Sequence, residues 1–440
     1  MQADKMTVEP VKKLFFHYLV PAIFGTLVTS IYILADTIII GKGIGIDAMA
    51  ALNIILPMFS VFFGIGLWYG VGGSVLMSIS RGRGEFQKGD TYFSVALILN
   101  TASCVLCTLM LWFFMEPVMR FLGATDVTMP YIKQYAPYVI VGMCCFAFST
   151  FLQTFVRNDG APKLAMVAVI SGGVLNIILD IIFVFPLKMG MGGAALASVI
   201  GSATSSLIAL SHFLSKKNGL HFSPKGFHFG FITQIYKNGF TSFLIEVSSG
   251  IVTFFFNLQL LKYVGDVGVS MYGVIANTAI IVTCLCNGVN QAAQPIISVN
   301  QGAGLHKRIE SVKTIGLRTA FLICLVPTLM GLIVPNLFTY IFLKPNAAIL
   351  ALSPVAIRIY FPSFVLMGIN MFVVGYFQSI LKPHLSLILC LLRGCILSSI
   401  FVYILPPIFG TNGIWASVTL AECLTLILAV VFLKKSNRRR

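Results

Sequence analysis

Residues 14–40 read LFFHYLVPAIFGTLVTSIYILADTIII, and this stretch decides the class of fold. It is longer than the roughly 20 apolar residues that an α-helix needs to cross a bilayer. Its only acid is Asp36, and it contains neither Lys nor Arg. Runs of similar length and character follow along the rest of the chain, so the sequence predicts a membrane protein built from spanning helices.

The composition of the whole chain agrees with this prediction. Of its 440 residues, 58% are hydrophobic and only 10% are charged, whereas a soluble domain has roughly 25% charged residues. The net charge of +16 is carried mainly by short loops between the apolar runs. We therefore expect the lipid bilayer, and no nucleic acid, as the partner of these basic residues.

Twelve spans are predicted, which makes the fold an all-α polytopic membrane protein. They lie near 14–40, 48–80, 92–115, 131–155, 163–186, 190–214, 236–262, 268–298, 315–342, 352–378, 384–407 and 411–434.

The distribution of basic residues predicts the orientation of these spans. Arg393 falls inside a span. Of the other Lys and Arg residues, most lie in the loops on the same side as the N-terminus. The few in the opposite loops are Lys42, Arg120, Lys133, Lys188, Lys262, Lys344 and Arg358. By the positive-inside rule, both termini face the cytoplasm. The expected location is the bacterial inner (cytoplasmic) membrane.

The chain also repeats itself at a nearly constant offset. Residues 78–84 (SISRGRG) align with residues 298–304 (SVNQGAG), Pro162 with Pro383, and Gly192 with Gly413. Each half holds six spans, and because six is even, the two six-helix bundles are related by a parallel repeat. We expect an N-terminal bundle at 1–214, a cytoplasmic linker at 215–235 and a C-terminal bundle at 236–440. The expected assembly is a monomer with its substrate site between the bundles.

Two acids of the first half fall at nearly the same depth inside spans. Asp36 lies shortly before the outer loop after span one, and Asp180 lies shortly before the outer Pro186. Asn176 precedes Asp180 by one helical turn, and Tyr32 precedes Asp36 in the same way. A charge inside a bilayer costs at least roughly 2.5 kcal/mol and usually marks an ion pathway. These residues predict a proton or sodium site at Asp36, Asn176 and Asp180; the alternative is that each acid hydrogen-bonds a neighbouring helix.

The second half lacks this pair, because the repeat places Asn257 opposite Asp36 and Phe401 opposite Asp180. Glu246, Arg393 and Glu422 fall near mid-membrane instead. We expect Glu422 to neutralise Arg393 structurally. For Glu246 a structural role and a role in coupling or substrate binding both remain open.

Span eight has a polar face formed by Asn287, Asn290, Gln291 and Gln294, whose spacing matches one side of a helix. Such a face lines a water-filled cavity or a helix contact. We include Asn257, Asn287, Gln291, Gln294 and Tyr32 among the candidate substrate or coupling residues.

No nucleotide-binding motif G-x-x-x-x-G-K-[ST] occurs, and no His, Cys or acid cluster suited to catalysis is visible. We therefore expect a transporter and not an enzyme, without a cofactor other than a coupling proton or Na⁺.

Three stretches carry a resemblance to a known family. Residues 31–41 (IYILADTIIIG) with Pro21, residues 291–297 (QAAQPII) and residues 300–303 (NQGA) resemble the first and eighth helices of the multidrug and toxic compound extrusion (MATE) family. Gly73 and Ser74, before the turn at 81–84, fit its second helix. The resemblance spans the chain and includes the six-plus-six repeat.

The resemblance implies antiport, in which cationic, lipophilic compounds leave while protons or sodium ions enter. It matches the family's carboxylates on helices one and five to Asp36 and Asp180, its amide to Asn176 and its acid on helix seven to Glu246. Some relatives carry another acid on helix ten, where this chain has Asn370, and this departure shifts the expected ion site to the N-terminal bundle. The alternative from the same superfamily is a flippase for a lipid-linked saccharide, which tends to have fourteen spans and a basic cavity.

Overall fold

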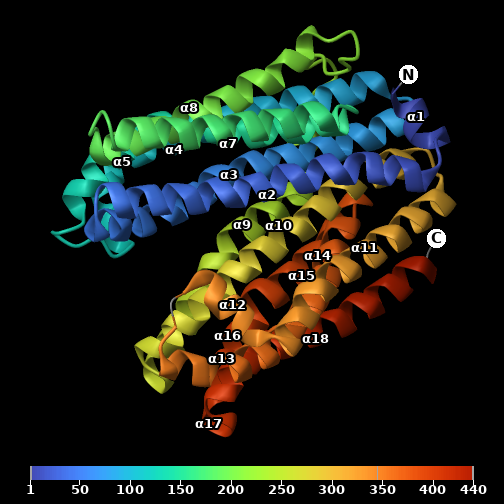
Figure 1. Cartoon of the computed structure of the whole chain (residues 1–440). Coiled ribbons are helices and arrows are strands. Elements are labelled where there is room, and N and C mark those ends of the chain that lie inside the picture. The colour runs from blue at the N-terminus through green and yellow to red at the C-terminus, as the bar shows by residue number, and fades with distance from the viewer. Residues whose placement is uncertain (1, 344, 439–440) are drawn as a thin grey trace. The chain divides into compact units, whose positions relative to one another are not determined.

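The computed structural model describes residues 2–343 and 345–438, except for the side chains of residues 2–4, 46, 249–251, 254, 437 and 438. Over these residues the fold is all-helical (Figure 1). In the first half the helices are α1 (Gln2–Val8), α2 (Val11–Gly43), α3 (Ile46–Gly82), α4 (Phe86–Phe121), α5 (Met129–Val141), α6 (Met143–Asn158), α7 (Pro162–Val184), α8 (Gly190–Leu210) and the short η1 (Ser211–Leu214).

The second half begins with two long helices and ends with shorter, interrupted ones. They are α9 (Phe229–Tyr263), α10 (Asp266–Gly302), α11 (His306–Ile333), α12 (Pro335–Phe342), α13 (Ala347–Tyr360), α14 (Pro362–Ser379), α15 (Pro383–Leu391), the π-helical turn η2 (Leu392–Ile396), α16 (Leu397–Ile404), α17 (Pro406–Phe409) and α18 (Thr411–Arg438).

The number of helices that can cross a membrane is close to the twelve predicted. Ten helices in the described part of the chain are long and apolar enough to cross a bilayer, and the bent pair α5 and α6 forms one more. The 35-residue α9 is also long enough to cross, and part of its side chains lies outside the description. The expectation of an all-α polytopic fold is therefore confirmed.

Several predicted spans are not straight helices. The span expected at 131–155 consists of α5 and α6, which meet at Gly142 with a bend of 48°. The span expected at 315–342 is divided between α11 and α12, and the one at 384–407 contains the π-helical turn η2. Each break lies inside one long apolar run of the sequence, although Pro335 begins α12 and Arg393 lies within η2. The length of an apolar run does not show where its helix bends.

The internal repeat has a counterpart in backbone geometry. Gly84 follows the end of α3 at φ 81°, and its repeat partner Gly304 follows the end of α10 at φ 71°. In both turns the amide three residues past the helix end donates to a carbonyl of the last helical turn, from Glu85 to Ser80 at 2.9 Å and from Leu305 to Asn300 at 2.9 Å. Only glycine adopts this left-handed conformation without steric cost, which explains why both halves end the helix with one.

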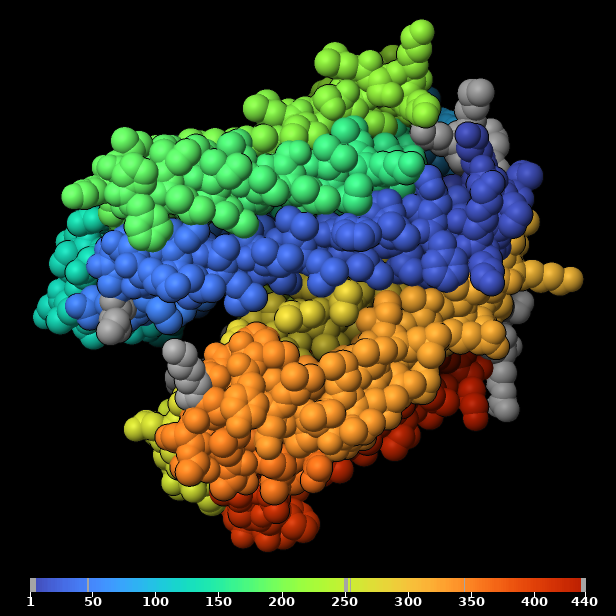
Figure 2. All heavy atoms as spheres, viewed as in Figure 1, coloured from blue at the N-terminus to red at the C-terminus, as the bar shows by residue number. Residues whose placement is uncertain are grey.

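The chain divides into two compact units. The first comprises Met1–Val247 and Ser298–His306, and the second comprises Ser248–Ile297 and Lys307–Arg440. In the first unit α7 packs along both α2 and α8, and Figure 2 shows these helices lying along one another, α2 in blue and α7 and α8 in green. The domain boundaries 1–214, 215–235 and 236–440 expected from the repeat stay a prediction.

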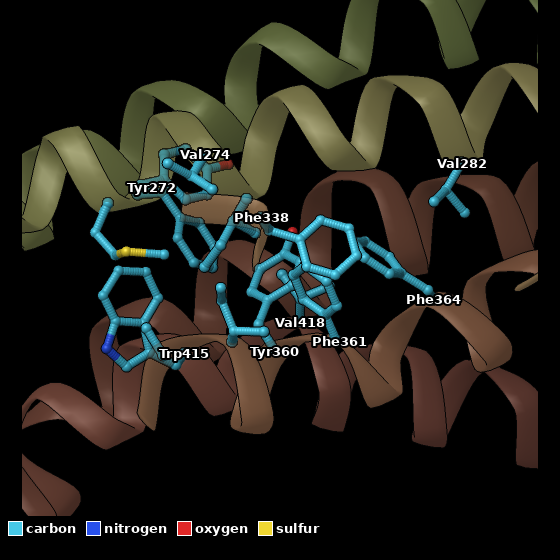
Figure 3. Close-up of a cluster of buried hydrophobic side chains, with 14 of the residues drawn as sticks. Tyr272, Val274, Val282, Phe338, Tyr360, Phe361, Phe364, Trp415 and Val418 are labelled. Carbon is cyan, nitrogen blue, oxygen red and sulfur yellow. The ribbon is translucent and has the colours of Figure 1, made fainter. Parts of the chain in front are cut away.

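The second unit is held together by a buried aromatic core, shown in Figure 3. The ring of Phe361 lies between Phe338 and Phe364, with centroid separations of 4.8 Å and 4.7 Å. Tyr360 and Trp415 bring α13 and α18 into the same cluster. Aromatic side chains dominate core packing because each buries a large apolar area, so this cluster fixes the helices that carry the unit's polar residues.

Candidate functional site

The predicted ion site lies where α2 and α7 pack together in the first unit. Asp180 on α7 is fully buried, with 0% of its side chain exposed, and Asp36 on α2 is half-buried. The two carboxyl groups are close enough to interact with each other. The shared depth inferred from sequence thus corresponds to direct proximity of the two side chains.

Asn176 is placed beside this pair by a close contact between α7 and α8. A Cβ atom on Gly172 would lie 2.6 Å from the carbonyl oxygen of Gly201, and one on Gly201 would lie 2.8 Å from the Cβ atom of Asn176. Because neither glycine has a side chain, the backbones approach closely enough for Asn176 Nδ2 to donate to Ser198 Oγ at 3.2 Å. This bond fixes the orientation of the Asn176 amide and leaves its Oδ1 atom without a hydrogen-bond donor.

Several buried oxygens of the site have no hydrogen-bond donor within the described part of the chain. They are Asp36 Oδ1, both carboxylate oxygens of Asp180, and Asn176 Oδ1. No Lys, Arg or His among the described residues forms a salt bridge with Asp36 or Asp180. Two adjacent carboxylates can hydrogen-bond each other only if one carries a proton, and a hard cation such as Na⁺ would bind the same oxygens. The donor set therefore fits either a shared proton or a sodium ion.

Tyr135 on α5 belongs to the same site and was missed by sequence reasoning. Its ring is fully buried, and its hydroxyl has no hydrogen-bond partner by distance and angle. The hydroxyl interacts electrostatically with Asp36, Asp180 and Tyr32. Tyr32 itself is half-buried and packs on Gly173 of α7. A tyrosine in the predicted fourth span could have been noticed, but nothing in the sequence indicates which way it faces.

Glu246 is on α9 and is the only other acid of the predicted coupling set in the first unit. It is half-buried and lies next to α3, where a Cβ atom on Gly64 would be 3.7 Å from its own Cβ atom. Phe243 packs at the same position on Gly64. The ring of Trp68 lies 5.0 Å from that of Phe243 and 5.1 Å from that of Phe240, measured between centroids. Its role stays a prediction.

The amides predicted from the second half are on α9 and α10 in the second unit. Asn257, Asn287 and Gln291 are half-buried, and Gln294 is 9% exposed. Within the same polar face, Asn290 donates to the Met371 carbonyl of α14 at 3.1 Å. This face therefore includes at least one helix contact, and the roles of Asn257, Asn287, Gln291 and Gln294 in substrate binding or coupling stay predictions.

The second unit also contains the expected ion pair between Arg393 and Glu422. Arg393 Nη2 lies 2.8 Å from Glu422 Oε1, and Arg393 Nε donates to the same oxygen at 3.1 Å. Asn370 Nδ2 donates to Glu422 Oε2 at 2.7 Å. Glu422 thus differs from Asp36 and Asp180, because both its oxygens have charged or polar donors. The predicted pairing of Glu422 with Arg393 is confirmed, and its structural role stays a prediction.

Cysteine, histidine and acid side chains in the described ranges do not converge on a metal site in groups of three or more. A transition-metal centre of the usual N/S type has no ligand set there. The carboxylate and amide oxygens around Asp180 are a different kind of site, suited to a proton or an alkali cation.

Comparison with known proteins identifies the family. The family model described as MatE matches residues 21–182 and 240–404, which is most of the chain. The multidrug export protein MepA of Staphylococcus saprophyticus is 26% identical over 432 residues, covering 96% of this chain and 93% of that protein. MepA of Staphylococcus aureus N315 is 25% identical over 431 residues, with the same coverage.

Solved structures agree with this assignment at the level of the fold. A multidrug resistance MATE family transporter of the MOP superfamily, solved in an outward-facing conformation, matches with a TM-score of 0.91 at 23% identity. The match covers 98% of this chain and 97% of that one. A MOP superfamily transporter from Pyrococcus furiosus matches with a TM-score of 0.91 at 22% identity and the same coverage. The expected MATE fold is confirmed, and the protein with this buried acid pair belongs to the MatE family of membrane transporters and is not an enzyme.

Proposed function

We propose that this protein exports cationic, lipophilic compounds and that the entry of protons or sodium ions at Asp36 and Asp180 drives the export. The observation that carries the proposal is the pair of carboxyl groups that lie side by side without any basic partner among the described residues. Holding both groups ionised in a low-dielectric bundle is unfavourable, so a proton or cation must occupy the site in part of the cycle.

Multidrug efflux itself follows from the family and from its relatives. The chain is a multidrug efflux transporter of the MatE family. The MepA proteins, which it resembles over nearly their whole length, are multidrug export proteins. The finer statements, on the coupling ion and the charge of the substrates, are our own proposal.

The site couples ion binding to the arrangement of α2, α5, α7 and α8. When Asp36 and Asp180 share a proton or hold Na⁺, their mutual repulsion disappears and the helices can approach. When the site is empty, the same repulsion favours a more open arrangement. A drug is transported against its gradient only if it binds these two arrangements with different affinities.

The residues suited to a sodium ion are Asp36, Asp180 and Asn176, each with a buried oxygen that lacks a donor. A proton needs only the two carboxylates. In both cases the Tyr135 hydroxyl can donate to a carboxylate oxygen or turn its lone pairs toward the cation, since a hydroxyl is both donor and acceptor.

Attraction of cationic substrates is assigned to Glu246. Its side chain meets α3 at Gly64, where the ring of Phe243 also lies, and that ring is 5.0 Å from the ring of Trp68. Aromatic faces attract cations, with Trp the strongest, so this neighbourhood suits an amphipathic cation. The amides Asn257, Asn287, Gln291 and Gln294 would supply neutral hydrogen bonds.

We place the protein in the bacterial cytoplasmic membrane as a monomer, with both termini in the cytoplasm. The support is the concentration of Lys and Arg in every second loop. Orientation is tested by labelling single cysteines from outside intact cells, after the native cysteines have been replaced.

The coupling is tested by following ethidium efflux in cells while the proton and sodium gradients are collapsed separately. Efflux that stops with one gradient and survives loss of the other identifies the ion. Efflux that survives the loss of both would overturn antiport. A lipid flippase would give no ethidium resistance at all, so ethidium resistance distinguishes a drug exporter from a flippase.

A further inference from the structure

The loop between α8 and α9 exposes an unusual combination of side chains. Lys216, Lys217 and Lys225 are exposed. Phe222, Phe227 and Phe229 are 60%, 46% and 80% exposed. We define these six residues as the loop surface. Its chain leaves the C-terminal end of α8 in Figure 1, directly after the candidate membrane span Gly190–Leu214, and so lies next to a membrane boundary.

The lysines of the loop surface carry uncompensated charge. The sequence has no Asp or Glu between Asp180 and Glu246. None of the three lysines forms a salt bridge with a described carboxylate. The neighbouring acids are already engaged: Asp90 pairs with Arg81 at 3.2 Å, and the buried Asp159 pairs with Arg81 and His212.

A buried polar network beneath the loop fixes its backbone. Gly219 donates its amide to Asp159 Oδ2 at 2.8 Å, while its carbonyl accepts from Arg81. A Cβ atom at position 219 would lie 2.6 Å from Asp159 Oδ1, so only glycine fits. The network gives the loop a defined conformation instead of a freely moving one.

Two further contacts hold the second part of the loop on α4. The Ser223 amide donates to Ser94 Oγ at 2.7 Å, and Thr91 Oγ1 donates to the Lys225 carbonyl at 2.8 Å. Leu220 is 1% exposed and anchors the loop from below. The backbone that carries the three exposed phenylalanines is therefore held in place.

We propose that the loop surface is a binding site for the headgroup of an anionic phospholipid, with the phenylalanine rings placed at the headgroup level and the lysines on the phosphate. Aromatic rings favour the membrane–water interface, and basic residues beside it are attracted to anionic lipids. A loop held rigidly pays little conformational entropy on binding the lipid. The site is separate from the coupling site and adds a lipid requirement to the transporter.

The test uses the full chain reconstituted in phosphatidylcholine vesicles with spin-labelled phosphatidylglycerol or spin-labelled phosphatidylcholine. The fraction of motionally restricted label gives the selectivity for the anionic headgroup. The wild-type protein should select phosphatidylglycerol, and salt should weaken this selectivity. Each lysine should contribute roughly fivefold or less, so Lys216→Gln/Lys217→Gln/Lys225→Gln should remove most of it.

The matched control is Lys12→Gln/Lys13→Gln/Lys307→Gln, which removes the same charge from exposed lysines outside the loop. It should retain most of the selectivity. An equal loss in both triple variants would show a general effect of net charge and would overturn the proposal.

A second variant keeps every charge. Phe222→Ser/Phe229→Ser changes two exposed rings whose removal leaves no cavity, so folding is preserved. Its selectivity should fall severalfold, because the lysines lose their anchor at the headgroup level. Wild-type selectivity in this variant would contradict the proposal, since charge alone would then suffice.

Discussion

The carboxylate of Glu422 is held by the guanidinium of Arg393 at 2.8 Å and by the Asn370 amide at 2.7 Å, whereas Asp36 and Asp180 face each other with no basic partner in the described chain. This contrast separates the acids inside the membrane into two kinds. We expect the paired Glu422 to have a structural role, and we propose that the unpaired Asp36 and Asp180 bind the coupling ion.

Glu422→Gln should lower the amount of folded protein in the membrane. Removing one partner of a buried ion pair leaves Arg393 uncompensated and costs roughly 3–5 kcal/mol. The measurement is the folded, monodisperse fraction after detergent extraction. Adding Arg393→Met, which removes the orphaned charge, should recover much of the loss. Normal yield from Glu422→Gln alone would contradict a structural role.

Asp36→Asn should abolish gradient-driven efflux while the protein reaches the membrane normally. The substitution fixes one carboxyl group in a neutral form, so the pair can no longer gain and lose an ion. Removing an unpaired buried charge relieves a cost and should not reduce folding. Asp180→Asn should be nearly as severe and Asn176→Ala milder. Wild-type efflux by Asp36→Asn across a range of pH and sodium concentration would place the coupling site elsewhere.

Tyr135→Phe should weaken binding of the coupling ion by about three- to tenfold, the range expected when one hydrogen bond worth roughly 0.5–1.5 kcal/mol is lost. The ring and its packing remain, and the hydroxyl has no hydrogen-bond partner of acceptable geometry here, so thermal stability should be kept. The measurement is the ion concentration that gives half-maximal efflux. An unchanged value would remove Tyr135 from the site.

Gly201→Ala should reduce both thermal stability and efflux. The new methyl group would lie 2.7 Å from the Gly172 carbonyl and 2.8 Å from the Asn176 Cβ atom, forcing α7 and α8 apart. Such overpacking typically costs roughly 1–3 kcal/mol. The control is Gly273→Ala on α10, where a Cβ atom meets nothing within 4 Å and helix propensity favours alanine. Equal melting temperatures for the two variants would show that the close contact is not needed.

Glu246→Gln should lower efflux of cationic drugs without changing expression. The side chain is half-buried beside aromatic rings, and its charge is the only feature that the change removes. Efflux of several cations should be compared with that of an uncharged substrate, which serves as the control. Loss restricted to cations supports substrate attraction, and unchanged efflux of all cations would return Glu246 to a structural role.

Sequence reasoning reached the spans, the repeat and the two unpartnered acids, but it could not find all of the site. Tyr135 and Ser198 were missed because each stands among other polar residues of its span, and nothing in the sequence singles it out. Their contribution depends on the rotation of α5 and α8 about their axes, which is set by packing against neighbouring helices. The breaks at Gly142 and at Leu392–Ile396 were missed because each lies within one long apolar run, and the length of a run does not show where its helix bends.

The sequence by itself determined that the chain crosses a membrane many times and that it consists of two repeated halves. Both can be read from the order of local segments, since about 20 consecutive apolar residues are enough to form one membrane-spanning helix. Only the tertiary structure decided which buried acids have partners. Glu422 meets Arg393 and Asn370, while Asp36 meets Asp180, because such contacts depend on how the helices pack. At Gly173 of α7, for example, the missing side chain lets Tyr32 of α2 approach closely.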